Sequence, residues 1–267
     1  MNTYEVTLKN NISEDQEADM LLRVALDIGE GMLKSGGEIH RVESTVARIC
    51  KAYGAEHVEI FAIPSVIIGA IRMKDGEYSS QVRRIDGSEN HLYRLELFNA
   101  ISRKICKQKP AFEIVDEMIY EAKHKKKSYP NFIRVIAAAM AAGSFAVFFG
   151  GSLLDGVVAA IIGIVIFFID IIPTGQINRL AKTVIQSFIG GSLACLAVNV
   201  GIGDDVGMIM IGTIMLLIPG VSFGTAFRDL MCGDFLAGSL RTVQCILAAL
   251  MIAAGYMLSM FVMGGIV

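Results

Sequence analysis

The sequence predicts an α+β cytoplasmic domain followed by an all-α integral membrane domain of five transmembrane helices. The first observation is uneven charge: of 24 basic and 26 acidic residues, only five and six lie after residue 127. The second is a series of long apolar stretches in that same half, as a bilayer core of about 30 Å requires. We therefore expect a flexible terminus at 1–14, the cytoplasmic domain at 15–127 and the membrane domain at 128–267.

The cytoplasmic domain shows helical and strand periodicities in succession. Apolar residues from Met20 to Met32 keep to one helical face, and Asp75-Gly76 is typical of a hairpin turn between strands. In order, the expected elements are a helix from about residue 15 to Gly36, a helix at 38–53, strands at 58–63, 66–73 and 78–85, and helices at about 88–107 and 112–125.

The membrane domain contains five apolar runs whose loops differ in charge. Lys and Arg gather beside the loops on one side, whereas the opposite loops carry glycine, serine and aspartate, so the N-terminus is expected in the cytoplasm and the C-terminus outside. An odd number of spans indicates a missing partner or a homo-oligomer, since transporter cores pair related halves. The predicted spans lie at about 132–149, 153–172, 183–202, 206–221 and 242–262.

Several classes of protein are excluded by composition. The net charge of −2 provides no basic field for nucleic acid, and the lysines at 123 and 125–127 are interpreted as a topology signal before the first span. The five cysteines form no C-x-x-C pair and have no histidine at zinc-ligand spacing, so we expect neither a metal nor a cofactor. No nucleophile elbow, phosphate loop or H-E-x-x-H motif is found, and we expect no enzyme.

A glycine turn in the cytoplasmic domain is a candidate functional motif. Gly36 and Gly37 precede a helix whose first turns carry Arg41 and Glu43. Backbone N–H groups at a helix start, with Arg41 nearby, could hold an anion. The alternative interpretation is a simple helix break with exposed side chains.

Two aspartates border the second predicted span. Asp155 lies near its external end, where it is either a functional group facing a wet cavity or the N-cap of the span. Asp170 lies near the cytoplasmic end, where the helix dipole disfavours a carboxylate, which makes it the better functional candidate.

The most informative segment follows the fourth predicted span. Pro219 and Gly220 interrupt an apolar helix, and four charged residues follow within a short distance: Arg228, Asp229, Asp234 and Arg241. Broken helices at membrane depth are tolerated against protein or a wet cavity, where arginines could bind a carboxylate and aspartates could carry a proton. The alternative is an interfacial turn, with Asp234 capping the fifth span and the arginines at headgroups.

At these residues the chain resembles the threonine/serine exporter family, specifically the larger, N-terminal-type component of its split, two-protein form. The motifs that carry the resemblance are Ser35-Gly36-Gly37 with Arg41-Val42-Glu43, Gly150-Gly151 with Asp155, and Pro219-Gly220 with Arg228-Asp229-Leu230, Gly233-Asp234 and Gly238. The resemblance implies a multi-pass protein of the bacterial inner membrane that exports threonine, serine or a dicarboxylate such as succinate. It also implies that a second small membrane protein completes the pathway.

The leading hypothesis is therefore a secondary transporter component that exports small carboxylate-bearing metabolites across the lipid bilayer. In it, Arg228 or Arg241 binds the substrate carboxylate and an aspartate couples movement to protons. The alternative is a membrane-anchored sensor or assembly subunit whose cytoplasmic domain binds a partner. Against this alternative, a simple anchor needs neither a broken helix nor acidic groups at the ends of its spans.

Overall fold

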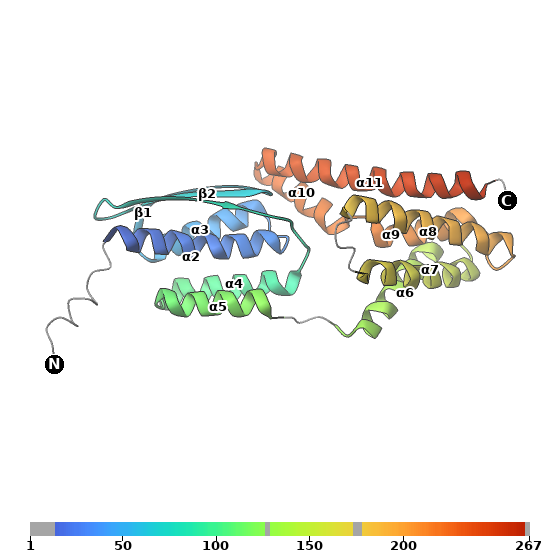
Figure 1. Ribbon diagram of the computed structural model, residues 1–267, viewed down its shortest axis with the longest axis horizontal. Helices are drawn as coiled ribbons and strands as arrows, with labels where there is room; N and C mark the ends of the chain where they lie inside the picture. The colour runs from blue at the N-terminus through green and yellow to red at the C-terminus, as the bar shows by residue number, and fades with distance from the viewer. Residues whose placement is uncertain (1–13, 126–128, 173–177, 265–267) are drawn as a thin grey trace. The chain divides into compact units, whose positions relative to one another are not determined.

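The computed structural model describes residues 14–125, 129–172 and 178–264 (Figure 1). The expected flexible terminus at 1–14 lies almost wholly outside these residues, as do two lysines of the topology signal, Lys126 and Lys127. The chain divides into two compact units. We call them the α+β unit, made of Met1–Lys127 and Val221–Thr242, and the helical unit, made of Ser128–Gly220 and Val243–Val267.

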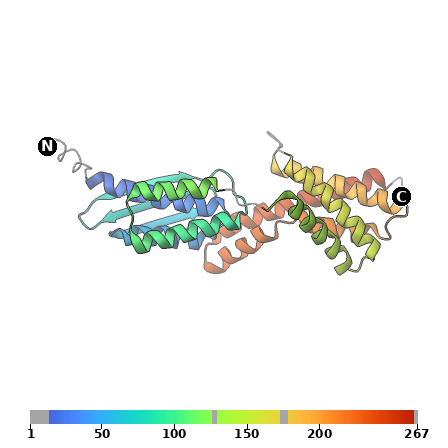
Figure 2. The ribbon, with the colours of Figure 1, turned by 90° about the horizontal axis from the view of Figure 1, so that it is seen from below.

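The α+β unit is layered, with a sheet on one side of two helix layers. Figure 1 shows α2 and α3 against the sheet, and Figure 2 shows α4 and α5 on the other side of these helices. The strands form an antiparallel sheet in the order β1-β2-β3, as the hairpin signal predicts. The elements are α2 (Glu14–Lys34), α3 (Ile39–Ala52), β1 (Ala55–Ile63), β2 (Val66–Met73), β3 (Tyr78–Arg84), α4 (Leu92–Gln108) and α5 (Phe112–His124).

The core of this unit lies around α2, which is buried between the sheet and the α4–α5 layer. Leu22 and Leu26 of α2 are fully buried and lie close to Gly69 on β2, while a Cβ at Gly31 would overlap the ring of Phe98 on α4. Large apolar side chains thus fill the interior, and a glycine is used where an aromatic ring meets the α2 backbone.

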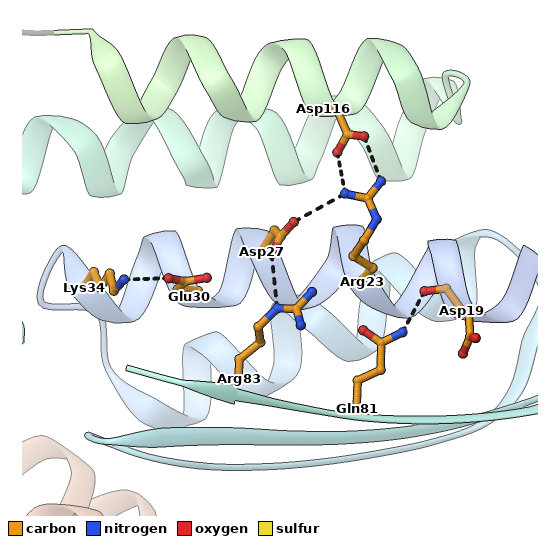
Figure 3. A network of polar contacts seen from close by, with 8 residues as sticks. All are labelled: Asp19, Arg23, Asp27, Glu30, Lys34, Gln81, Arg83 and Asp116. Atoms are coloured by element: carbon orange, nitrogen blue, oxygen red, sulfur yellow. Dashed lines mark hydrogen bonds and ion pairs between the residues drawn. The ribbon is translucent and has the colours of Figure 1, made fainter. Parts of the chain in front are cut away.

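Charged residues of α2 fix the neighbouring elements at the edge of that core (Figure 3). The guanidinium of Arg23 donates two hydrogen bonds, of 3.1 and 2.7 Å, to the carboxylate of Asp116 on α5. Asp27 accepts from Arg83 on β3 at 3.2 Å. The bidentate geometry restricts α5 relative to α2 more tightly than a single contact would.

The helical unit is packed through small residues. Ala142 and Ala146 of α6 are fully buried, and a Cβ at Gly212 of α9 would lie 2.5 Å from the carbonyl oxygen of Ala142. Backbones therefore approach closely, as is common between helices in a membrane. The helices are α6 (Asn131–Phe148), α7 (Leu153–Ile171), α8 (Arg179–Asn199), α9 (Val206–Leu217) and the part of α11 (Phe235–Met263) that follows Thr242.

Among the residues that the structure describes, four helices are long and apolar enough to cross a membrane, namely α6, α7, α8 and α11. A fifth span exists only if α9 and α10 (Gly220–Cys232) are counted together as one broken span. The expected fourth span at 206–221 is therefore not one continuous helix. With 12 residues, α9 extends only about 18 Å, and Pro219 ends it because proline lacks an N–H and restricts the residue before it.

The segment 221–242 also differs from expectation, because it belongs to the α+β unit and not to the helical unit. The sequence interpretation placed its four charged residues beside the membrane pathway. In the structure, three of them contact the turn between α2 and α3, which supplies polar partners that a bilayer lacks.

Candidate functional site

The turn between α2 and α3 has a backbone shape that only a few residue types adopt easily. Gly36 has a φ of +87°, and the N–H of Gly37 donates to the carbonyl of Met32 at 2.9 Å. This geometry closes the C-terminus of α2 and turns the chain directly into α3. It leaves the carbonyl of Gly37 and the N–H of Ile39 pointing to partners outside the turn.

A tight helical hairpin supplies those partners. α10 ends at Cys232, Gly233 has a φ of +94°, and α11 begins at Phe235. A Cβ at Gly238 would lie 2.9 Å from the backbone nitrogen of Leu230, so glycine allows the two helices to approach closely. The hairpin brings Asp229 and Arg241 together although they are twelve positions apart.

Asp229 caps α3 from a distance of 190 positions in the chain. Its Oδ1 accepts a hydrogen bond of 3.0 Å from the N–H of Ile39, the first residue of α3. Glu38, the N-cap residue of α3, makes no side-chain capping bond of its own. A carboxylate from α10 therefore does what a capping side chain normally does. It accepts a hydrogen bond from a free backbone N–H at the helix N-terminus and places a negative charge at the positive end of the helix dipole.

Arg241 completes the contact from α11. It donates to the carbonyl of Gly37 at 2.8 Å, and its Nη1 lies 3.0 Å from Oδ2 of Asp229 in an ion pair not aligned as a hydrogen bond. The Asp229 side chain is 1% exposed and that of Arg241 9% exposed. A buried pair of this kind is costly to break, because each charge depends on the other once water is excluded.

Arg228 adds a more exposed contact beside the buried pair. Its guanidinium lies 2.6 Å from the Glu38 carboxylate, and its side chain is 63% exposed. We name this set of contacts the α2–α3 clasp. It consists of Gly37, Glu38 and Ile39 on one side and Arg228, Asp229 and Arg241 on the other.

The other predicted residues of this region lie around the clasp. Glu43 accepts from the N–H of Ala62 at 2.7 Å, which joins α3 to β1. Burial raises the pKa of the Glu43 carboxyl, and the negative charges of Asp234 and Asp229 raise this pKa further, against the opposing effect of the Ala62 bond. Arg41 is exposed, and Oδ2 of Asp234 is buried without a hydrogen-bond partner among the described residues.

Asp155 lies in the helical unit, where backbone groups surround it. It forms a capping box with Ser152 at the start of α7, and its Oδ1 accepts from the N–H groups of Asp204 and Asp205 at 2.8 and 3.1 Å. Its side chain thus holds the loop before α9 against the start of α7. The N-cap of α7 is therefore Ser152 and not Asp155, which instead supplies the reciprocal bond of the capping box and also binds a loop that the sequence pattern did not connect to it.

Asp170 and the helix break have different surroundings. The Asp170 side chain is 62% exposed, and Nζ of Lys182 lies 3.6 Å from its carboxylate and donates to its backbone carbonyl at 2.5 Å. The lysine therefore offsets the unfavourable position of a carboxylate at a helix C-terminus. Pro219 lies between α9 and α10, and Gly220, the first residue of α10, donates its N–H to the carbonyl of Ile218 at 2.8 Å.

One polar contact in the helical unit was missed by the sequence interpretation. The hydroxyls of Thr213 on α9 and Tyr256 on α11 lie 2.8 Å apart, and both side chains are buried. A single threonine or tyrosine within an apolar run gives no spacing signal, so the pairing was not predictable. Polar contacts of this type commonly join helices within a membrane.

Together, an α+β unit and several long apolar helices define a multi-pass membrane protein with a substantial domain outside the apolar spans. A family model described as "Putative threonine/serine exporter" (ThrE) matches residues 23–263. The chain belongs to this family, a family of membrane exporters.

A curated relative supports the same assignment. Over 259 residues the chain is 22% identical to a Mycobacterium tuberculosis protein named "Probable threonine/serine exporter", covering 92% of this chain and 47% of that protein. The chain thus spans about half the length of this relative. No solved structure matches the chain.

Proposed function

We propose that the chain is a component of a secondary exporter in the bacterial cytoplasmic membrane. Its substrates are small carboxylate-bearing metabolites: hydroxy amino acids such as threonine and serine, or a dicarboxylate such as succinate. Membership of the exporter family supports transport, and the name of the M. tuberculosis relative supports the amino acids. In this proposal a second small membrane protein completes the pathway, five spans cross the bilayer, the N-terminus is cytoplasmic and the C-terminus is external.

The α2–α3 clasp is the observation that carries the mechanism. Within the α+β unit, the clasp holds the segment 221–242 against the glycine turn through Asp229 and Arg241. Arg228 is the accessible member, and a substrate carboxylate would compete with Glu38 for its guanidinium. This competition would loosen the turn and allow the segment 221–242 to move during transport.

A proton could act at the same place. Protonation of Asp229 would remove the charge that balances Arg241 and weaken the cap on α3. The carboxylate of Asp234 on the same hairpin is the second candidate proton carrier. Because like charges and burial both disfavour ionised carboxylates, a proton-coupled cycle has a physical basis at the clasp.

The test is efflux from cells that lack the gene. Retention of labelled threonine, serine and succinate is compared after expression of this chain alone and together with the small membrane protein encoded nearby. Efflux restored only by the pair would support a two-component exporter and identify the substrate. No efflux of the three compounds in either case would instead favour the sensor or assembly alternative.

A mutational test separates the clasp from general folding. Arg228→Gln should reduce efflux strongly while the protein stays in the membrane at the wild-type level. Arg41→Gln, at an exposed position of the neighbouring helix turn, is the matched control and should export normally. Equal efflux from both variants would remove Arg228 from the mechanism.

A further inference from the structure

The outward face of the sheet in the α+β unit carries three rows of three side chains. Phe61, Ile68 and Val82 lie in register across β1, β2 and β3. The neighbouring outward rows on either side are Glu59, Ala70 and Ser80, and Ile63, Val66 and Arg84. We call these nine residues the outer grid. Ile68 lies at its centre.

The outer grid is more apolar than an exposed sheet face normally is. The exposed fractions of Phe61, Ile68 and Val82 are 50, 41 and 60%. An antiparallel sheet with one solvated face usually alternates apolar inward and polar outward residues. The inward residues of this sheet already pack on α2 and α3, so the apolar outward row is not part of the hydrophobic core of the unit.

The charges of the outer grid occupy opposite corners. Glu59 is diagonal to Arg84 across Ile68, and the other two corners are Ser80 and Ile63. Arg84 contacts Asp86 at 3.1 Å, but both side chains are about four-fifths exposed, and such surface pairs contribute little. Breaking the pair between Arg84 and Asp86 therefore costs little free energy, so Arg84 can bind another carboxylate instead.

We propose that the outer grid binds the outer grid of a second copy of this chain. A twofold axis along the diagonal from Ser80 to Ile63 brings Glu59 of each copy to the same corner of the contact as Arg84 of the other, within reach of the long arginine side chain. The same axis places Ile68 on Ile68 and brings Phe61 close to Val66 and Val82 close to Ala70. Every charge then meets its opposite and every apolar residue an apolar one, with the strands of the two sheets crossing at a large angle.

The size of the surface fits a weak contact within a membrane. Nine outward residues cover much less than the roughly 800 Å² per partner of a typical stable complex. Two copies held in one bilayer meet at a high effective concentration, so a small self-complementary face is sufficient. The inference depends on the sheet and on anchoring in the membrane, and it holds or fails independently of the exported substrate.

Cysteine cross-linking in native membranes tests the contact. Ile68→Cys is introduced in a Cys232→Ala background, because Cys232 is the native cysteine with an exposed side chain. Tyr120→Cys on α5, 64% exposed, is the control for random collisions. We expect oxidation to give a band of twice the monomer mass at a yield several-fold above the control. An equal yield, or a cross-link only to a protein of another mass, would overturn the proposal.

A charge exchange tests the register. Glu59→Arg and Arg84→Glu should each lower the Ile68→Cys cross-linking yield several-fold, because like charges then face each other. The double variant restores both pairs and should recover most of the yield. A double variant no better than the two single variants would exclude the proposed axis.

Discussion

Asp155 in the helical unit and Asp229 in the α+β unit are both aspartates that are 1% exposed, but their carboxylates bind different kinds of partner. Asp155 binds backbone N–H groups, two of them from the loop before α9. Asp229 binds one backbone N–H and the guanidinium of Arg241. The first carboxylate therefore depends on backbone N–H groups, one from its own helix start and two from a loop 49 and 50 positions away, whereas the second depends on a cation from another helix.

The comparison distinguishes a structural cap from a contact that can open. A carboxylate bound by backbone N–H groups has no charged partner that a competing ion could displace. A buried ion pair between two helices and a distant turn can be broken by a proton or by a competing charge. We therefore propose that Asp155 contributes to stability and that the clasp takes part in conformational change. The predictions below test this division in order of decreasing effect.

The largest effect is expected for Asp229→Ala. The change leaves Arg241 buried without its counter-ion and the start of α3 without its cap. The free energy of unfolding in detergent should fall by about 3–5 kcal/mol, as measured by denaturant titration.

The matched control is Asp229→Leu combined with Arg241→Met. Removing both charges together should recover part of this loss, because the unpaired charge is gone. If the double variant is less stable than Asp229→Leu alone and than Arg241→Met alone, Asp229 and Arg241 do not form an ion pair in solution.

Asp155→Ala should have the next largest effect, with a loss of about 2–3 kcal/mol from one cap and two unsatisfied N–H groups. Asp155→Asn keeps an acceptor oxygen and should lose less. The efflux per folded molecule should be unchanged in both variants, which distinguishes Asp155 from Asp229. If an Asp155 variant lost efflux but kept the stability of wild type, Asp155 would have a role in transport.

Glycine substitutions compare the packing of the two units. Gly212→Ala in α9 would place a methyl group against the α6 backbone and should cost about 1–3 kcal/mol. Gly224→Ala in α10 has open space around the new Cβ and should stabilise by up to about 1 kcal/mol through helix propensity. Melting temperatures that change equally in both variants would contradict the close packing of α6 and α9.

The smallest effect concerns Glu43, whose raised pKa means that folding favours its protonated form. Its contribution to stability is present in full below pH 4.5, the ordinary pKa, and is lost as pH rises through the raised pKa of the folded state. Glu43→Gln keeps an acceptor for Ala62 but cannot ionise. Relative to wild type, this variant should therefore gain stability between pH 4.5 and pH 7. A constant difference in melting temperature across this interval would exclude the pKa shift.

Local patterns predicted much of the fold. The strand at 66–73, the hairpin at Asp75-Gly76 and the helix starting at Phe112 were expected nearly as the structure has them. These elements are encoded by periodicity and turn chemistry over a few residues. The family was likewise recognisable from short motifs and is confirmed by the family model.

The surroundings of the charged segment after Pro219 could not be predicted in the same way. Asp229 and Ile39 are separated by 190 positions, and no spacing rule connects a helix start with a carboxylate that far along the chain. The apolar character of α10 also resembles that of a membrane span, although most of the helix belongs to the α+β unit. Which polar partner a buried charge finds is decided by tertiary packing, and one sequence does not contain that information explicitly.

Hydrogen exchange at the start of α3 tests the clasp most directly. Exchange of a peptide covering residues 37–42 is measured by mass spectrometry in the full chain, in wild type, Asp229→Ala and the control Asp155→Ala. We predict that the Asp229 variant exchanges at least tenfold faster in this peptide, while the Asp155 variant matches wild type there. Equal exchange in all three proteins would show that Asp229 does not cap α3 and would contradict the clasp.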